Sequence, residues 1–154
     1  MCLGWQWSMK LIMKVDKEYL KELLEAFESV KTPLTNIQEL AELGYDYKTD
    51  AFAFHSDILV DKGFIQTLSS NDKLYGAGYQ LSSVGSRVWI PTVPLRLTAA
   101  GHEFIDSLNE PNVWETIQTN FKESSLDTIK SVAIDLAKGY AKRKVTKILS
   151  ESDT

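Results

Sequence analysis

Hydrophobic residues recur at helical spacing in three successive segments near the start of the chain. Residues 16–30 contain no Gly or Pro, and Asp16 is a preferred N-cap. A second helix is expected at about residues 35–43, where Thr35 or Asn36 can cap it and Gly44 is suited to end it. A third is expected at about residues 48–62, and Gly63 is suited to end it. Helix, short helix, a Gly-containing turn and helix is the order of a helix-turn-helix. The residues expected to face inward are Tyr19, Leu20, Leu23, Leu24, Phe27, Val30, Ile37, Leu40, Ala41, Leu43, Ala51, Phe54, Ile58 and Leu59.

The pattern changes after Gly63, where short runs of aromatic and β-branched residues alternate with turn residues. These runs predict strands at about residues 64–68, 79–84, 87–90 and 95–97. A hairpin that follows a helix-turn-helix and leads into another helix is a wing. We therefore predict an α+β fold whose core is a winged helix-turn-helix.

Three more helices are expected in the last third of the chain. Thr98 can cap a helix at residues 99–108. A shorter helix follows at residues 113–121, and the longest runs from Ser124 or Ser125 to about Leu149. The predicted organisation is an N-terminal extension at residues 1–15, a winged helix-turn-helix domain at 16–110 and a C-terminal helical extension at 111–154.

The last helix carries an apolar stripe that has two interpretations. In the first, Ile129, Leu136 and Tyr140 form the seam of a homodimer, since two-fold DNA sites favour two-fold proteins. In the second, the stripe packs on the helices at 16–30 and 99–108 of the same chain. Both stay open at the level of the sequence.

Charge is distributed unevenly along the chain. The 154 residues carry 17 basic and 21 acidic side chains, a net charge of −4, whereas a sequence-independent nucleic-acid binder is usually basic. Residues 16–46 hold eight acids against three lysines, and residues 130–149 hold six bases against Asp135 alone. Such polarity can steer a partner, or it can reflect solvated helix faces.

Residues for catalysis or metal binding are sparse. The two histidines, His55 and His102, lie 47 positions apart, and the one cysteine, Cys2, cannot form an internal disulfide, which fits a reducing cytoplasm. No nucleophile with a neighbouring base and no Gly-Lys-Ser/Thr phosphate loop is present. No apolar run approaches the roughly 20 residues that span a bilayer. We expect no enzyme, no cofactor, no metal site and no membrane span.

The third helix and the wing are the candidate reader of double-stranded DNA. Asp50 and Asp57 would repel phosphate there, so the alternative is a protein–protein interaction adaptor that uses an acidic or aromatic face with Phe52 and Trp89. A basic patch would favour DNA, and an acidic or apolar face a protein partner. The nucleic-acid-binding candidates are Lys48, Thr49, Phe52, His55, Ser56, Lys73 and Arg87. For His55 the alternative, which we favour, is a structural role as a partly buried hydrogen-bonding residue.

Two motifs resemble those of a bacterial family of unknown function that is often associated with phages and prophages. Residues 54–65, Phe-His-Ser-Asp-Ile-Leu-Val-Asp-Lys-Gly-Phe-Ile, resemble its Tyr-His-x-x-x-Leu-x-x-Ala-Gly-Leu-Ile stretch. Residues 97–106, Leu-Thr-Ala-Ala-Gly-His-Glu-Phe-Ile-Asp, are similar to its most distinctive motif, and Trp114 matches a tryptophan that follows. The resemblance covers roughly residues 9–149. It implies a winged-helix core and a phage-related regulatory or DNA-binding role, with no catalytic residues to carry over.

Overall fold

The computed structural model describes residues 13–152 and divides the chain into two compact units. The first unit ends at Leu97 and the second begins at Thr98. Most of the predicted N-terminal extension therefore lies outside the described residues. The described part is mixed α+β, which confirms the predicted fold class.

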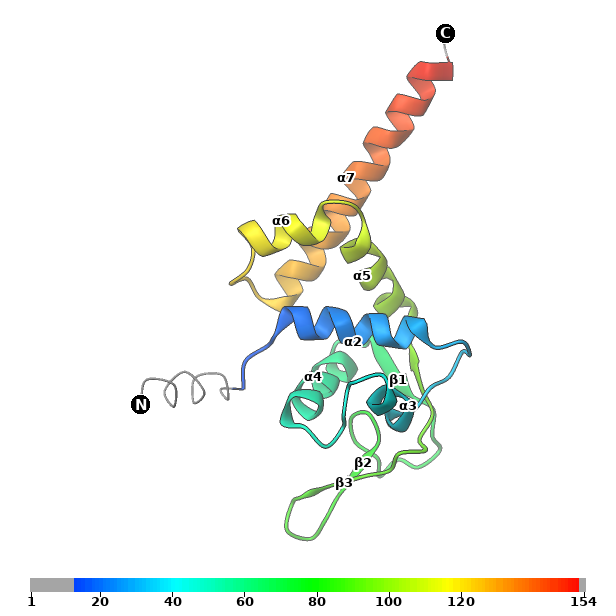
Figure 1. The fold of residues 1–154 in the computed structure, drawn as a ribbon, viewed down its shortest axis with the longest axis vertical. Coiled ribbons are helices and arrows are strands. Elements are labelled where there is room, and N and C mark those ends of the chain that lie inside the picture. Colours follow the sequence, from blue (N-terminus) through cyan, green and yellow to red (C-terminus); the bar gives the residue numbers. More distant parts are fainter. Residues whose placement is uncertain (1–12, 153–154) are drawn as a thin grey trace, which may run out of the picture. The chain divides into compact units, whose positions relative to one another are not determined.

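Three helices form one side of the first unit (Figure 1). They are α2 (Lys17–Ser29), α3 (Ile37–Glu42) and α4 (Asp50–Asp61), close to the predicted bounds. Each begins with a side-chain cap, because the carboxylate of Asp16, the amide oxygen of Asn36 and the hydroxyl of Thr49 accept hydrogen bonds from backbone N–H groups of the first turn.

Two antiparallel strand pairs, one nested inside the other, complete the first unit. The outer pair joins β1 (Ile65–Thr67) to β4 (Leu95–Leu97), and the inner pair is the hairpin of β2 (Tyr79–Leu81) and β3 (Arg87–Trp89). Thr35, just before α3, exchanges two backbone hydrogen bonds of 2.8 Å with Leu95. Because Leu95 also pairs with Thr67, β4 lies between two neighbouring segments.

The inward face of α4 differs from the prediction. Phe52, His55, Ser56 and Leu59 are buried, whereas Ala51, Phe54 and Ile58 are only half-buried. The apolar residues of α4 occur on every side of the helix, so their spacing does not identify one buried face. Leu43, expected inside, is 49% exposed at the end of α3.

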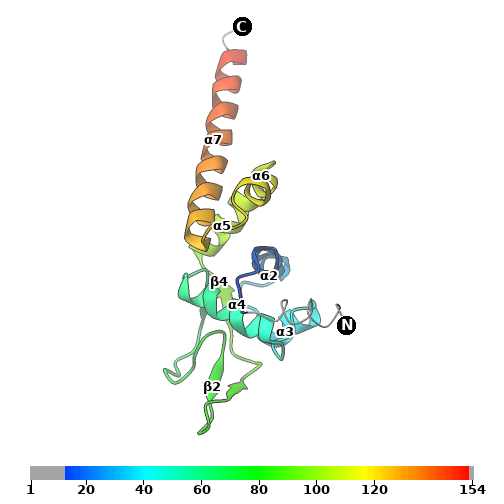
Figure 2. The same cartoon turned by 90° about the vertical axis from the view of Figure 1, so that its left-hand side faces the viewer.

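Helices are the regular elements of the second unit over residues 98–152. It contains α5 (Ala99–Asn109), α6 (Val113–Asn120) and α7 (Leu126–Ser152), and α5 and α6 both pack on α7 (Figure 2). Thr98 caps α5 by accepting from the backbone N–H of Gly101, as expected. None of the helices in residues 13–152 has the length and apolar character needed to cross a membrane.

The proposed dimer seam on α7 needs a correction. Ile129 is 1% exposed, so it belongs to the packed interior and is not available to a second chain. Leu136 and Tyr140 are half-buried. The first half of α7 instead packs against α5 and α6 within the same unit.

Candidate functional site

The outward face of α4 is acidic. Asp50 and Asp61 are exposed at its two ends, and Asp57 lies between them at the spacing that places all three on one side of the helix. Two half-buried residues on that side, Ala53 and Val60, carry no side-chain donor or charge. This helix face therefore offers acceptors rather than the basic or amide donors that read DNA bases.

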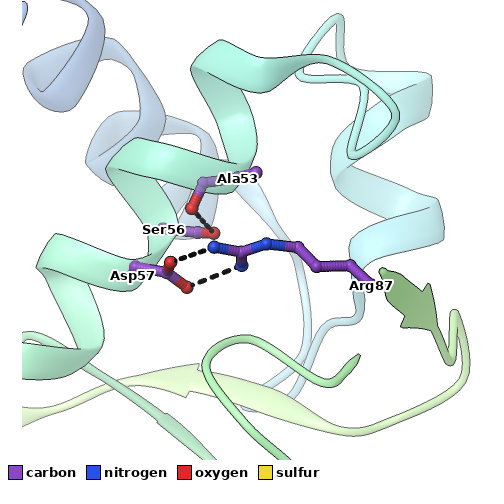
Figure 3. Close-up of polar contacts among 4 residues, drawn as sticks. All are labelled: Ala53, Ser56, Asp57 and Arg87. Atoms are coloured by element: carbon purple, nitrogen blue, oxygen red, sulfur yellow. Dashed lines mark hydrogen bonds and ion pairs between the residues drawn. The ribbon is translucent and has the colours of Figure 1, made fainter. Parts of the chain in front are cut away.

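Arg87 of the hairpin is held on α4 by Asp57 (Figure 3). Its Nη1 donates to Asp57 Oδ1 at 3.0 Å and its Nη2 donates to Oδ2, a bidentate pair. The guanidinium also lies 4.1 Å from the ring centroid of Tyr79. Donation of hydrogen bonds to Asp57 raises the pKa of Arg87, and this pair occupies the nitrogens Nη1 and Nη2 that would otherwise contact a phosphate.

An aromatic cluster joins the hairpin to α4 beside this ion pair. Trp89 lies at its centre, with ring centroids 5.8 Å from Phe52, 5.2 Å from Tyr79 and 6.0 Å from Tyr47. Arg87 and Trp89 are two residues apart on β3 and therefore point to the same side of the hairpin. The sequence analysis missed the roles of Tyr79 and Asp57, which depend on the hairpin folding back over α4.

Three of the seven candidate DNA contacts are buried, which corrects the assignment of Phe52 and Ser56 and agrees with the structural alternative for His55. Phe52, His55 and Ser56 are 1%, 4% and 1% exposed, so their side chains cannot reach a DNA groove from the folded unit. Thr49 is exposed, but its hydroxyl caps α4 by accepting from the backbone N–H of Phe52. Lys48 and Lys73 remain as exposed bases.

His55 has a structural role in this unit. Its Nδ1 lies 2.6 Å from the Ala51 carbonyl oxygen, and its Nε2 accepts from the backbone N–H of Asp16 at 2.9 Å. These contacts fit a neutral ring with the proton on Nδ1. Burial lowers the pKa of His55, whereas the Ala51 carbonyl and the Asp16 carboxylate oppose that shift. The histidine thus connects α4 to the start of α2.

The hairpin itself exposes apolar side chains and no free charge. Residues 74–86 contain no charged side chain. Leu81 is 50%, Val84 86% and Val88 51% exposed. Leu81 pairs with Arg87 and shares its side of the hairpin, whereas Val88, between Arg87 and Trp89, points to the other side. We call the three aspartates of α4 together with Leu81 and Val84 the α4–hairpin surface.

The remaining sequence-based candidates show no clustering for catalysis in the described residues. His102 is exposed on α5 in the second unit, whereas His55 is buried in the first. Within residues 13–152, no three His, Cys, Asp or Glu side chains are grouped so that they could hold a metal ion.

Comparison with known proteins adds one finding. Residues 14–127 match the model of a protein family described as "Hypothetical protein (DUF2513)". The chain belongs to the DUF2513 family. Searches among curated proteins and among solved structures each returned no match for this DUF2513 protein.

Proposed function

We propose that this DUF2513 protein is a non-catalytic, cytoplasmic winged-helix module that binds a protein partner through the α4–hairpin surface. The observation that carries the proposal is the ion pair between Arg87 and Asp57, because it neutralises the wing's arginine on an acidic helix face. The proposal includes a phage-related role for the protein, which rests on the motif resemblance alone.

The order and pairing of elements support a winged helix. In this fold a helix-turn-helix is followed by a β-hairpin, and a short segment after the first helix joins the sheet. The helices α2, α3 and α4 precede β1 to β4, and Thr35 pairs with Leu95 in the corresponding place. The wing would then be the stretch from β1 to β4, with the β2–β3 hairpin at its tip.

The charge of the surface favours a protein over DNA. A duplex presents phosphates, and Asp50, Asp57 and Asp61 would repel them on the helix that reads DNA in other winged-helix proteins. A protein segment with apolar side chains flanked by Lys or Arg would match both the aspartates and the exposed Leu81 and Val84. The partner class is therefore a basic, apolar segment.

Fluorescence anisotropy with duplex DNA across a salt series tests the choice between DNA and protein. We expect no binding at low salt. Micromolar binding that weakens steeply with salt would support the DNA-binding hypothesis and overturn ours. The variant D50K/D61K, which makes the same helix face basic, serves as a positive control for detecting an electrostatic contact.

Selection from a displayed library of random peptides tests the partner class. We expect selected peptides to combine Lys or Arg with apolar residues, and their binding to be lost in Leu81→Ser/Val84→Ser. A matched control, Thr146→Ala on α7, should bind like the unchanged protein. Selected peptides that are acidic, or that bind the hairpin variant equally well, would contradict the proposed surface.

A further inference from the structure

The last part of α7 extends beyond the other helices of its unit. Residues 141–152 are all exposed, and Figure 2 shows α5 and α6 beside only the earlier part of α7. The family match ends at residue 127, so the family description does not cover this segment. We call residues 141–152 the arm.

The arm carries an apolar stripe with no cover in the described chain. Val145 is 53% and Ile148 is 54% exposed, and with Ala141 they follow Ile134 and Ala137 at spacings of three and four residues. Such spacing places all five on one helix face. An isolated helical segment of this length is marginal in water, so a partner on this face would stabilise it.

Charges flank the stripe and match a second surface in the same unit. Lys142 and Lys144 lie on either side of the stripe by helical geometry. On α5, Glu103, Asp106 and Glu110 are exposed, and α5 contains no Lys or Arg.

The acidic residues of α5 lie next to the apolar stripe of α7. A shallow groove of about 430 Å³ is lined by Glu103, Asp106 and Glu110 of α5 and by Ala137 of α7, which belongs to the stripe. Among the described residues, Asp106, Glu110, Lys142 and Lys144 form no ion pair.

We propose that the arm docks in the groove of a second copy of this chain, and that two such contacts form a symmetric antiparallel dimer. The arm has 12 residues and α5 has 11, so each is about 16–18 Å long. The stripe of one copy would lie on that of the other, near Ala137, and Lys142 and Lys144 would face the partner's α5. Because the two copies are related by a two-fold axis, each contact occurs twice.

This dimer differs from the seam expected from the sequence and is independent of the proposed function. It uses Ala141, Val145 and Ile148 rather than Ile129, Leu136 and Tyr140, which lie wholly or partly in the packed interior. All its residues belong to the second unit, whereas the α4–hairpin surface belongs to the first. Either proposal can therefore fail without the other.

Light scattering on a size-exclusion column tests the dimer. At about 100 μM protein we expect a mass near twice the 17.4 kDa of one chain, decreasing towards one chain on dilution. Val145→Glu should raise the dimer dissociation constant at least about tenfold, since each copy would place one glutamate in the apolar contact of the dimer. The matched control Val84→Glu, at the exposed hairpin tip, should stay dimeric. A single-chain mass for the unchanged protein at this concentration would overturn the proposal.

A charge exchange tests the pairing of the arm with α5. Asp106→Lys and Lys144→Glu should each raise the dissociation constant about tenfold, because each places two pairs of like charges across the seam. Mixing the two variants should restore a dimer, since both contacts of the mixed pair then join opposite charges. Circular dichroism checks that each variant keeps its helices. If Val145→Glu abolishes the dimer but Asp106→Lys has no effect, or the mixture stays monomeric, the groove is not the docking site.

Discussion

The β2–β3 hairpin and the arm both carry basic and apolar side chains, yet these side chains differ in their contacts. In the first, Arg87 is bound by Asp57 and lies over Tyr79, and Trp89 packs on Phe52. In the arm, Lys142 and Lys144 form no ion pair among the described residues, and every position is exposed. A count of bases along the sequence cannot separate a cation that is already bound from one that can bind a partner. Contacts between distant residues make that distinction.

The largest effect that separates the two regions is expected from truncating Phe52. The ring is 1% exposed and contacts Trp89, so Phe52→Ala should lower the free energy of unfolding by about 3–5 kcal/mol. Leu149→Ala on the arm, where the side chain is 60% exposed, should change it by less than about 0.5 kcal/mol. Urea denaturation of both variants measures the difference. Equal losses would mean that the arm is packed as tightly as the core of the first unit.

A pair of glycine substitutions, one beside the hairpin and one in α7 just before the arm, should change the free energy of unfolding with opposite signs. Gly76 has φ +49°, and a Cβ there would lie 2.7 Å from Asp57 Oδ1 and from the Tyr79 ring. Gly76→Ala should therefore lower the free energy of unfolding by about 2–3 kcal/mol, through backbone strain and displacement of the carboxylate.

The matched substitution is Gly139→Ala in α7. This glycine is helical and a Cβ would meet nothing within 4 Å, so alanine should raise the free energy of unfolding by up to about 1 kcal/mol. Thermal unfolding followed by circular dichroism gives both signs. A stabilising Gly76→Ala would show that the hairpin does not approach α4 as closely as described.

Most of the fold could be predicted from the sequence because its signals are local. Asp16, Asn36 and Thr98 cap helices where expected, and the nested strands lie within the predicted runs. The amphipathic stripe of α2 identified its buried face correctly, with Leu20, Leu23, Leu24 and Phe27 inside. Capping and periodicity depend on residues a few positions apart, so they can be read before any tertiary contact is known.

The candidate site could not be predicted in the same way. On α4 apolar residues occur on every side, and the buried face is fixed by contacts such as the one from His55 to Asp16, 39 positions away. The state of Arg87 depends on Asp57, 30 positions before it. Neither contact leaves a local pattern in the sequence, which is why Phe52 and Ser56 were assigned to the wrong side of the helix.

A smaller effect should come from the pH dependence of the first unit. Burial lowers the pKa of His55 below its usual 6.5, so the unfolded chain binds a proton more readily than the folded chain. Stability from this group is complete above about pH 6.5 and is lost as the pH falls through the lower, folded pKa. The slope is at most about 1.4 kcal/mol per pH unit. Melting temperatures between pH 7.5 and 5.5 should therefore decrease as the pH falls.

His55→Gln tests the origin of that slope. A glutamine keeps a neutral acceptor for the Asp16 N–H but cannot titrate, so its melting temperature should depend less on pH over the same interval. The control is His102→Gln, at an exposed position of the second unit, which should retain the slope. If the His55 variant keeps the full slope, other groups cause it.

The smallest expected effect is the coupling between Arg87 and Asp57, which decides whether the hairpin is fixed to α4. The two side chains are 32% and 28% exposed, so solvent screens the pair and a double-mutant cycle should give about 0.5–1 kcal/mol. Arg87→Lys should keep less than half of this coupling because an ammonium group cannot form the bidentate contact. The pair Lys21 and Glu25, one helical turn apart within α2, is the reference, with about 0.3 kcal/mol expected.

The same cycle connects stability to the choice of ligand. If Arg87 is bound as described, Asp57→Asn should weaken its hold on the guanidinium and add one positive charge to the surface. Affinity for duplex DNA should then rise in Asp57→Asn and fall again in Asp57→Asn/Arg87→Gln. A coupling near zero, with DNA affinity the same in both variants, would mean that Arg87 is already available and that the acidic face does not exclude DNA. The alternative result is a measurable coupling together with a DNA affinity that appears only when the pair is broken. That result would identify Asp57 as the residue that prevents this surface from binding DNA and leaves it to a protein partner.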